Sequence, residues 1–202
     1  MRTNLGYPDK ILYLRLLFFV WDMIRNIGVF CSSYDDIDTV FFDEGAKLGE
    51  WIGKTGRRLV FGGTSHGLME HIARAAKING GKVSGVVPES LAKAGFTSSF
   101  SDETVTVASL SERKETIIRM SDVLIAMPGG FGTLDEAFTA IASRRLGYHS
   151  KEVVFCNTAG VFDDLDSLLK KLMKQRFAPD SYLNYYKIFP SVEHCIEYLE
   201  NK

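Results

Sequence analysis

The chain has 202 residues, of which 46% are hydrophobic and 24% charged, an ordinary globular composition that excludes disordered, collagen-like and coiled-coil classes. Its formal net charge of −1 gives no electrostatic reason to expect a nucleic-acid polymer or a membrane surface as partner. The three cysteines, Cys31, Cys156 and Cys195, are too few and too scattered for a disulfide framework or a CxxC-type zinc site. We therefore expect a cytoplasmic protein that holds no metal.

The first residues differ in character from the rest. Ile11 to Trp21 form an apolar run that has the length of a signal-peptide core but is too short to span a bilayer. Arg15 interrupts this run and no small-residue cleavage site follows it. We expect residues 1–26 to be an N-terminal extension, either an apolar helix or a stretch preceding a natural start at Met23, and residues 27–202 to be a single domain.

From Ile27 onward, short β-rich apolar runs alternate with segments of helical length. Such alternation predicts an α/β fold, a Rossmann-like open parallel sheet of about seven strands with helices on both faces. Strands are expected at Ile27–Cys31, Arg58–Phe61, Val83–Val87, Thr104–Ala108, Val123–Met127, Val153–Cys156 and Tyr186–Phe189. Helices are expected at Thr39–Lys54, Leu68–Asn79, from Ser109 or Ser111 to Met120, Leu134–Leu146, Leu165–Phe177 and Val192–Leu199, the last capped by Ser191. Gly95 to Asp102 is expected to be a mobile surface loop.

Two glycine clusters each follow a strand and open a helix. Gly62, Gly63 and Gly67 form the first, and Gly129, Gly130 and Gly132 form the second. A turn of this kind presents free backbone N–H groups and the positive end of a helix to an anion. The first strand ends without a dinucleotide glycine fingerprint, and no GxxxxGK[ST] motif exists. A mononucleotide or sugar phosphate is the ligand class that remains.

Glu136 and the Arg113-Lys114 pair are charged residues that accompany the second turn. Thr133 and Glu136 match a capping box, so the carboxylate either caps a helix or serves a ligand. Arg113 and Lys114 stand at the start of a helix, where the helix dipole disfavours cations and a ligand would explain them. With the first, fourth and fifth strands as neighbours in a Rossmann order, Ser32, Arg113, the glycine turn and Glu136 would surround one crevice.

These residues carry a family resemblance. Pro128 to Glu136 reads PGGFGTLDE, which matches PGGxGTxxE, and Arg113-Lys114 supplies the preceding pair. With Gly67-Leu68-Met69 and Leu146 to His149, the region from about Ile27 to Phe177 resembles the LONELY GUY (LOG) family, once labelled lysine decarboxylases.

The resemblance implies a homodimeric or larger phosphoribohydrolase that cleaves the N-glycosidic bond of a nucleoside 5′-monophosphate, without metal or organic cofactor. The family's catalytic arginine and glutamate fall on Arg113 and Glu136. The expected substrate-binding residues are Ser32, Gly62, Gly63, Lys114, Gly129, Gly130, Phe131, Gly132 and Thr133.

Departures from the family pattern concern the base. Glu70 replaces a common glycine, and Gly95 and Ala142 replace a glutamate and a threonine of plant members. A purine monophosphate in general is therefore expected, rather than a cytokinin-type N6-substituted adenine alone. The alternative is a non-catalytic carrier or sensor of a nucleotide or of the molybdenum cofactor, which would need the glycine turn but not Glu136. A lysine decarboxylase is disfavoured, because no lysine is marked as the Schiff-base residue that pyridoxal phosphate requires.

Overall fold

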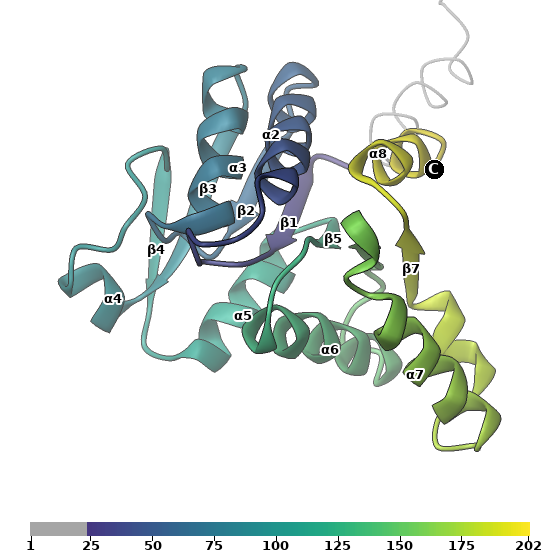
Figure 1. Ribbon diagram of the computed structural model, residues 1–202. Helices are drawn as coiled ribbons and strands as arrows, with labels where there is room; N and C mark the ends of the chain where they lie inside the picture. The colour runs from purple at the N-terminus through teal and green to yellow at the C-terminus, as the bar shows by residue number, and fades with distance from the viewer. Residues whose placement is uncertain (1–23) are drawn as a thin grey trace, which may run out of the picture.

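The computed structural model describes residues 24–202, and its centre is one sheet of seven parallel strands (Figure 1). The strands stand in the order β4-β3-β2-β1-β5-β6-β7. Their bounds are β1 Asn26–Phe30, β2 Arg58–Phe61, β3 Lys82–Pro88, β4 Glu103–Val107, β5 Val123–Ala126, β6 Val153–Cys156 and β7 Tyr186–Phe189. The predicted fold class and all seven predicted strands are confirmed, with ends displaced by at most one residue.

Helices cover both faces of this sheet. In Figure 1, α2, α3 and α8 lie on one face and α5, α6 and α7 on the other. Their bounds are α2 Thr39–Lys54, α3 Gly67–Ile78, α4 Glu89–Lys93, α5 Leu110–Met120, α6 Phe131–Arg145, α7 Asp163–Lys174 and α8 Val192–Glu200. The short α4 and two 3-10 turns, Thr158–Gly160 and Asp180–Asn184, were not predicted from the sequence.

Two hydrophobic clusters hold the layers together. Successive strand residues face opposite sides, so Val29 joins the cluster under α2, α3 and α8, whereas its neighbour Phe30 joins the cluster under α5, α6 and α7. The strands are consequently buried on both faces and read as unbroken apolar runs. Where α2 meets α3, a Cβ on Gly49 would lie 2.5 Å from the Ile72 carbonyl oxygen, so this helix contact needs a glycine.

The strand order corrects one expectation. The sequence predicted that β4 would be a neighbour of β1. In the structure, β4 is instead the edge strand beyond β3. The chain runs outward from β1 to β4, and α5 then returns across the sheet, packing on β1 to β4, to place β5 beside β1. The switch point therefore lies between β1 and β5, where open α/β sheets bind ligands.

Two helix starts bear on the site. Ser109 caps α5, since its side chain accepts a hydrogen bond from the N–H of Glu112 at 3.1 Å. By contrast, α6 begins at Phe131, three residues before the predicted Leu134, with Gly130 as a cap that offers no side chain. Ser191 caps α8 as predicted.

The segment Gly95 to Asp102 does not stand free of the fold. The N–H of Ser98 donates to the Gly63 carbonyl at 2.9 Å, and the N–H of Ser65 donates to the Phe96 carbonyl at 3.0 Å. Ser98 is buried. These contacts join the segment to the first glycine turn.

The expectations for the apolar run Ile11–Trp21 fall outside the described residues. β1 begins at Asn26, the last residue of the expected extension and one residue before the expected start of the domain. Among residues 24–202, the helices lack the length and apolar character needed to cross a bilayer.

Candidate functional site

Arg113 is the most constrained cation at the carboxyl end of the sheet. It lies in the first turn of α5 and is 8% exposed. Its Nε donates to the Val86 carbonyl at 3.1 Å, and its Nη2 donates to the Gly62 carbonyl at 2.9 Å. Its Nη1 donates to Oε1 of Glu136 at 3.1 Å. The guanidinium is thus fixed by β3, by the turn after β2 and by α6 at once.

Glu136 completes a buried ion pair. It is 5% exposed, and burial raises its pKa to about 7. The charge of Asp135 also raises this pKa, whereas the charge of Arg113 lowers it. The capping-box interpretation is wrong, because α6 begins at Phe131 and the carboxylate contacts Arg113 rather than the helix start. A carboxylate that titrates near neutrality is suited to accept or hold a proton.

The first glycine turn is closely packed against its neighbours. A Cβ on Gly62 would lie 1.6 Å from Nη2 of Arg113, so no other residue leaves room for the guanidinium. Gly63 has a φ of +69°, and a Cβ there would lie 2.4 Å from Cγ2 of Val87. The contacts of both glycines therefore position neighbouring residues.

The second glycine turn is open. Gly130, Phe131 and Gly132 are exposed, and a Cβ on either glycine would have no neighbour within 4 Å. Among the described residues, the N–H groups of Phe131, Gly132 and Thr133 have no acceptor, and the first turn of α6 holds no acidic residue. A long helix whose first N–H groups are unsatisfied attracts an anion.

Gly129 closes this turn against the end of β1. A Cβ on Gly129 would lie 2.1 Å from Oγ1 of Thr133 and 3.0 Å from the Ser32 nitrogen. The N–H of Ser32 donates to the Pro128 carbonyl at 3.1 Å, which ties the ends of β1 and β5 together. Ser32, Gly129 and Thr133 thus lie side by side, as the sequence predicts.

Two expected substrate-binding side chains, those of Lys114 and Phe131, lie outside the Arg113–Glu136 pair. Lys114 is ion-paired with Asp135, its Nζ lying 2.7 Å from Oδ2 of that residue. Phe131 is 95% exposed. Neither side chain contacts the Arg113–Glu136 pair by a hydrogen bond or an ion pair among the described residues.

Three other residues near the pair are uncharged, and one of them, Val86, was not predicted from the sequence. Val86 contributes only its backbone carbonyl, and a backbone carbonyl leaves no signal in a sequence. Sδ of Met69 lies 3.9 Å from Nη2 of Arg113, and Met69 is part of the Gly67-Leu68-Met69 segment that carries the family resemblance. Cys31 is a buried thiol whose pKa is raised by burial. Within residues 24–202, no three His, Cys, Asp or Glu side chains are grouped so that they would hold a metal ion.

Several known proteins are similar to this chain in sequence. A family profile described as "Possible lysine decarboxylase" matches residues 69–199. A protein of Oryza sativa subsp. japonica named "Probable cytokinin riboside 5'-monophosphate phosphoribohydrolase" is 35% identical over 176 residues, 87% of this chain and 78% of that protein. A cytokinin riboside 5'-monophosphate phosphoribohydrolase of Arabidopsis thaliana is 32% identical over 87% of this chain and 83% of its own length.

A solved structure extends the likeness to the fold. The molybdenum cofactor binding protein of the phototrophic bacterium Rippkaea orientalis superimposes with a TM-score of 0.69 at 25% identity, covering 89% of this chain and 98% of that one. The profile match includes Arg113, Glu136 and the second glycine turn, and each of the two plant relatives matches 87% of this chain. From the length and identity of these matches, the chain belongs to the LONELY GUY (LOG) family of phosphoribohydrolases.

Proposed function

We propose that this protein hydrolyses the N-glycosidic bond of a purine nucleoside 5′-monophosphate to the free base and ribose 5-phosphate. The observation that carries this proposal is the buried Arg113–Glu136 ion pair beside a helix whose first amides are free. The plant relatives, named as phosphoribohydrolases of cytokinin riboside 5′-monophosphates, support the reaction class.

Glu136 is the proposed catalytic carboxylate. Cleavage of a glycosidic bond passes through an oxocarbenium-like state, which a carboxylate beside the ribose stabilises. The same carboxylate orients the attacking water and takes its proton, a role that needs a pKa near the working pH. Burial, which raises the pKa of Glu136 to about 7, fits that role.

Arg113 is the proposed catalytic cation. Its Nε, Nη1 and Nη2 donate to Val86, Glu136 and Gly62, and Nη2 also lies 3.9 Å from Sδ of Met69. The second N–H of Nη1 therefore remains for a substrate. A fixed guanidinium in a buried site stabilises negative charge that develops on the departing base without having to reorganise. Its partners hold it in place before substrate binds.

The phosphate would occupy the start of α6. The free N–H groups of Phe131, Gly132 and Thr133 and the helix dipole favour a dianion there. Lys114 lies close by, paired with Asp135 of α6. Ser32 and Gly129 hold the turn against β1. Binding energy from the phosphate then positions the ribose against Glu136, which makes a monophosphate a better substrate than a nucleoside.

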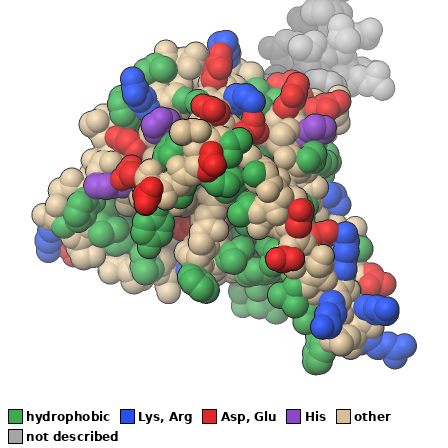
Figure 2. All heavy atoms as spheres, in the orientation of Figure 1, with side chains coloured by type: hydrophobic (Ala, Val, Ile, Leu, Met, Phe, Trp, Pro, Cys, Tyr) green, Lys and Arg blue, Asp and Glu red, His purple; other side chains and the backbone are tan. Residues whose placement is uncertain are grey.

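Homodimerisation is part of the proposal. Three apolar side chains of α5 and α6 and their ends, Leu110, Phe131 and Leu146, are each more than 60% exposed. Figure 2 shows apolar side chains gathered over α5 and α6. A second copy of the chain that covers them would remove this apolar area from water. Light scattering should give twice the chain mass, and Phe131→Ser should lower this mass.

We also propose the cytoplasm as the compartment, because a reducing compartment suits the three free cysteines.

A second candidate is a carrier without catalysis. The likeness to the molybdenum cofactor binding protein favours it. Such a carrier would use the glycine turn but has no need for a buried carboxylate of raised pKa.

A panel of 5′-monophosphates tests both candidates. AMP and N6-isopentenyl-AMP should each yield free base and ribose 5-phosphate, detected by chromatography and a reducing-sugar assay. Adenosine, which lacks the phosphate, should react at least about a hundredfold more slowly. Tight nucleotide binding in calorimetry with no turnover on any monophosphate would favour the carrier.

A further inference from the structure

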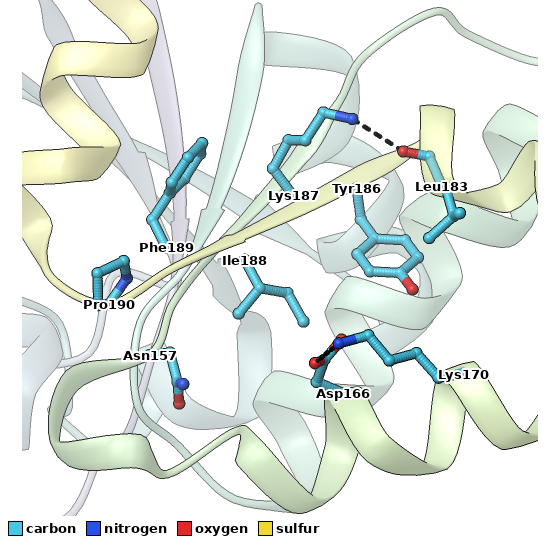
Figure 3. A pocket seen from close by; sticks show the side chains of 9 residues that line it. All are labelled: Asn157, Asp166, Lys170, Leu183, Tyr186, Lys187, Ile188, Phe189 and Pro190. Atoms are coloured by element: carbon cyan, nitrogen blue, oxygen red, sulfur yellow. Dashed lines mark hydrogen bonds and ion pairs between the residues drawn. The ribbon is translucent and has the colours of Figure 1, made fainter.

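A separate cavity lies between α7 and the edge strand β7 (Figure 3). Its volume is about 420 Å³, within the range of about 300–1,000 Å³ that holds small molecules. It shares no residue with the Arg113–Glu136 site. Its lining includes all four residues of β7, which lies two strands from β5 and so roughly 10 Å away across the sheet.

Tyr186 supplies the most unusual group in this cavity. Its side chain is 6% exposed, and its hydroxyl has no hydrogen-bond partner among residues 24–202. Figure 3 shows the phenol directed toward α7, where Asp166 and Lys170 lie. Buried tyrosine hydroxyls normally have a hydrogen-bond partner, because burying an unsatisfied donor is unfavourable. Burial and the Asp166 charge raise the pKa of Tyr186, so its hydroxyl stays a donor at neutral pH.

The remaining polar groups of the cavity offer mainly donors. Lys170 is ion-paired with Asp166, which leaves two of its three N–H groups free. Lys187 donates one N–H to the Leu183 carbonyl at 2.9 Å and has no carboxylate partner among the described residues. Two lysines against one aspartate give the lining a net charge of +1.

The walls on either side are apolar. Leu183 and Ile188 flank the Tyr186 ring, and Pro190 closes the end next to Asn157 (Figure 3). Asn157 adds little polarity, since its Nδ2 donates to Asp163 at 2.7 Å and its Oδ1 accepts from the Phe162 N–H at 2.6 Å. A ligand here has an apolar body and a polar end that accepts hydrogen bonds.

The geometry points to a second binding site, between α7 and β7, for a small organic monocarboxylate whose carboxylate accepts from the Tyr186 hydroxyl and pairs with Lys170. The apolar part of the ligand packs on Leu183 and Ile188. Because this cavity shares no residue with the Arg113–Glu136 site, a ligand here is distinct from the substrate of the proposed hydrolysis.

Phenylacetate is a suitable probe, titrated into the full-length protein and followed by amide chemical shifts. Shifts are expected in α7 and β7, with none in Gly129 to Thr133. Tyr186→Phe removes only the unpaired hydroxyl, so it should fold as well as the wild type and bind phenylacetate about tenfold more weakly. Lys170→Gln should weaken binding similarly.

Matched controls exist for both substitutions. Tyr148→Phe removes an exposed phenol outside the cavity, and Lys93→Gln breaks an exposed ion pair of the same spacing, with Glu89. Both controls should bind phenylacetate like the wild type. Equal binding by wild type and Tyr186→Phe would overturn the site. So would shifts confined to the glycine turn, and tighter binding of inorganic phosphate than of phenylacetate would overturn the carboxylate assignment.

Discussion

Nη1 of Arg113 and Oε1 of Glu136 lie 3.1 Å apart, and both residues are less than one-tenth exposed. They come from different helices, α5 and α6, which enter the site from opposite sides of the switch point. Buried ion pairs contribute little net stability, because the desolvation of both charges offsets their attraction. A pair placed next to free helix amides is therefore better explained by chemistry than by folding.

Replacing Glu136 by glutamine should abolish most of the activity while the protein stays folded. The amide retains an oxygen that accepts from Arg113 but cannot take a proton from water or stabilise a cationic sugar. We expect kcat on AMP to fall by about 10²–10⁴-fold. Glu115→Gln, which removes an exposed carboxylate of α5, is the control and should leave kcat unchanged. Substantial turnover by Glu136→Gln would reduce this carboxylate to a structural partner of Arg113.

The activity should depend on pH through Glu136. Since the carboxylate acts in its ionised form and burial raises its pKa to about 7, kcat/KM should fall about tenfold per pH unit below 7. The Asp135 charge raises this pKa, so Asp135→Asn should move the acidic limb to lower pH. An acidic limb near the ordinary glutamate pKa in the wild type would contradict the proposed base.

How far the sequence predicts this protein depends on the kind of signal. Strands such as Arg58–Phe61 and Val153–Cys156 were predicted to the residue, because buried parallel strands are short apolar runs bounded by turns. The five residues of α4 are too few to show a helical period. The place of β4 at the sheet edge was missed, because strand order depends on which face the crossover helices cover and not on local pattern.

The site was predictable in part for a similar reason. Arg113, Glu136 and the Gly129 to Thr133 turn were singled out because charged residues and glycines stand out at strand ends, and the structure brings them to the same end of the sheet. The Val86 carbonyl was not found, since every residue carries one. The contact of Gly62 with Arg113 was also hidden, because a glycine next to a strand does not show which side chain packs against it.

Stability should also report on the Glu136 proton. The unfolded chain loses it near the ordinary value of 4.5, whereas the folded protein keeps it up to about 7. The folded state therefore binds more protons between these values, and the free energy of unfolding falls as pH rises through this window. Urea unfolding of wild type and Glu136→Gln should give a difference that shifts by at most about 3 kcal/mol between pH 4.5 and 7.5. A difference that stays constant would mean that the fold does not raise this pKa.

The two glycine turns should respond differently to alanine. In Gly62→Ala the new Cβ would lie 1.6 Å from Nη2 of Arg113, and the β2 turn cannot yield without losing its contacts, so the guanidinium must leave its position. We expect kcat to fall at least about a hundredfold, as when a catalytic charge is misplaced by an ångström. In Gly132→Ala the Cβ enters open space where the phosphate is proposed to bind, so KM for AMP should rise more than kcat falls. Steady-state kinetics on both variants, with circular dichroism to check folding, separates these effects. The same loss of kcat in both variants, with KM unchanged, would contradict the assignment of the first turn to Arg113 and of the second to the phosphate.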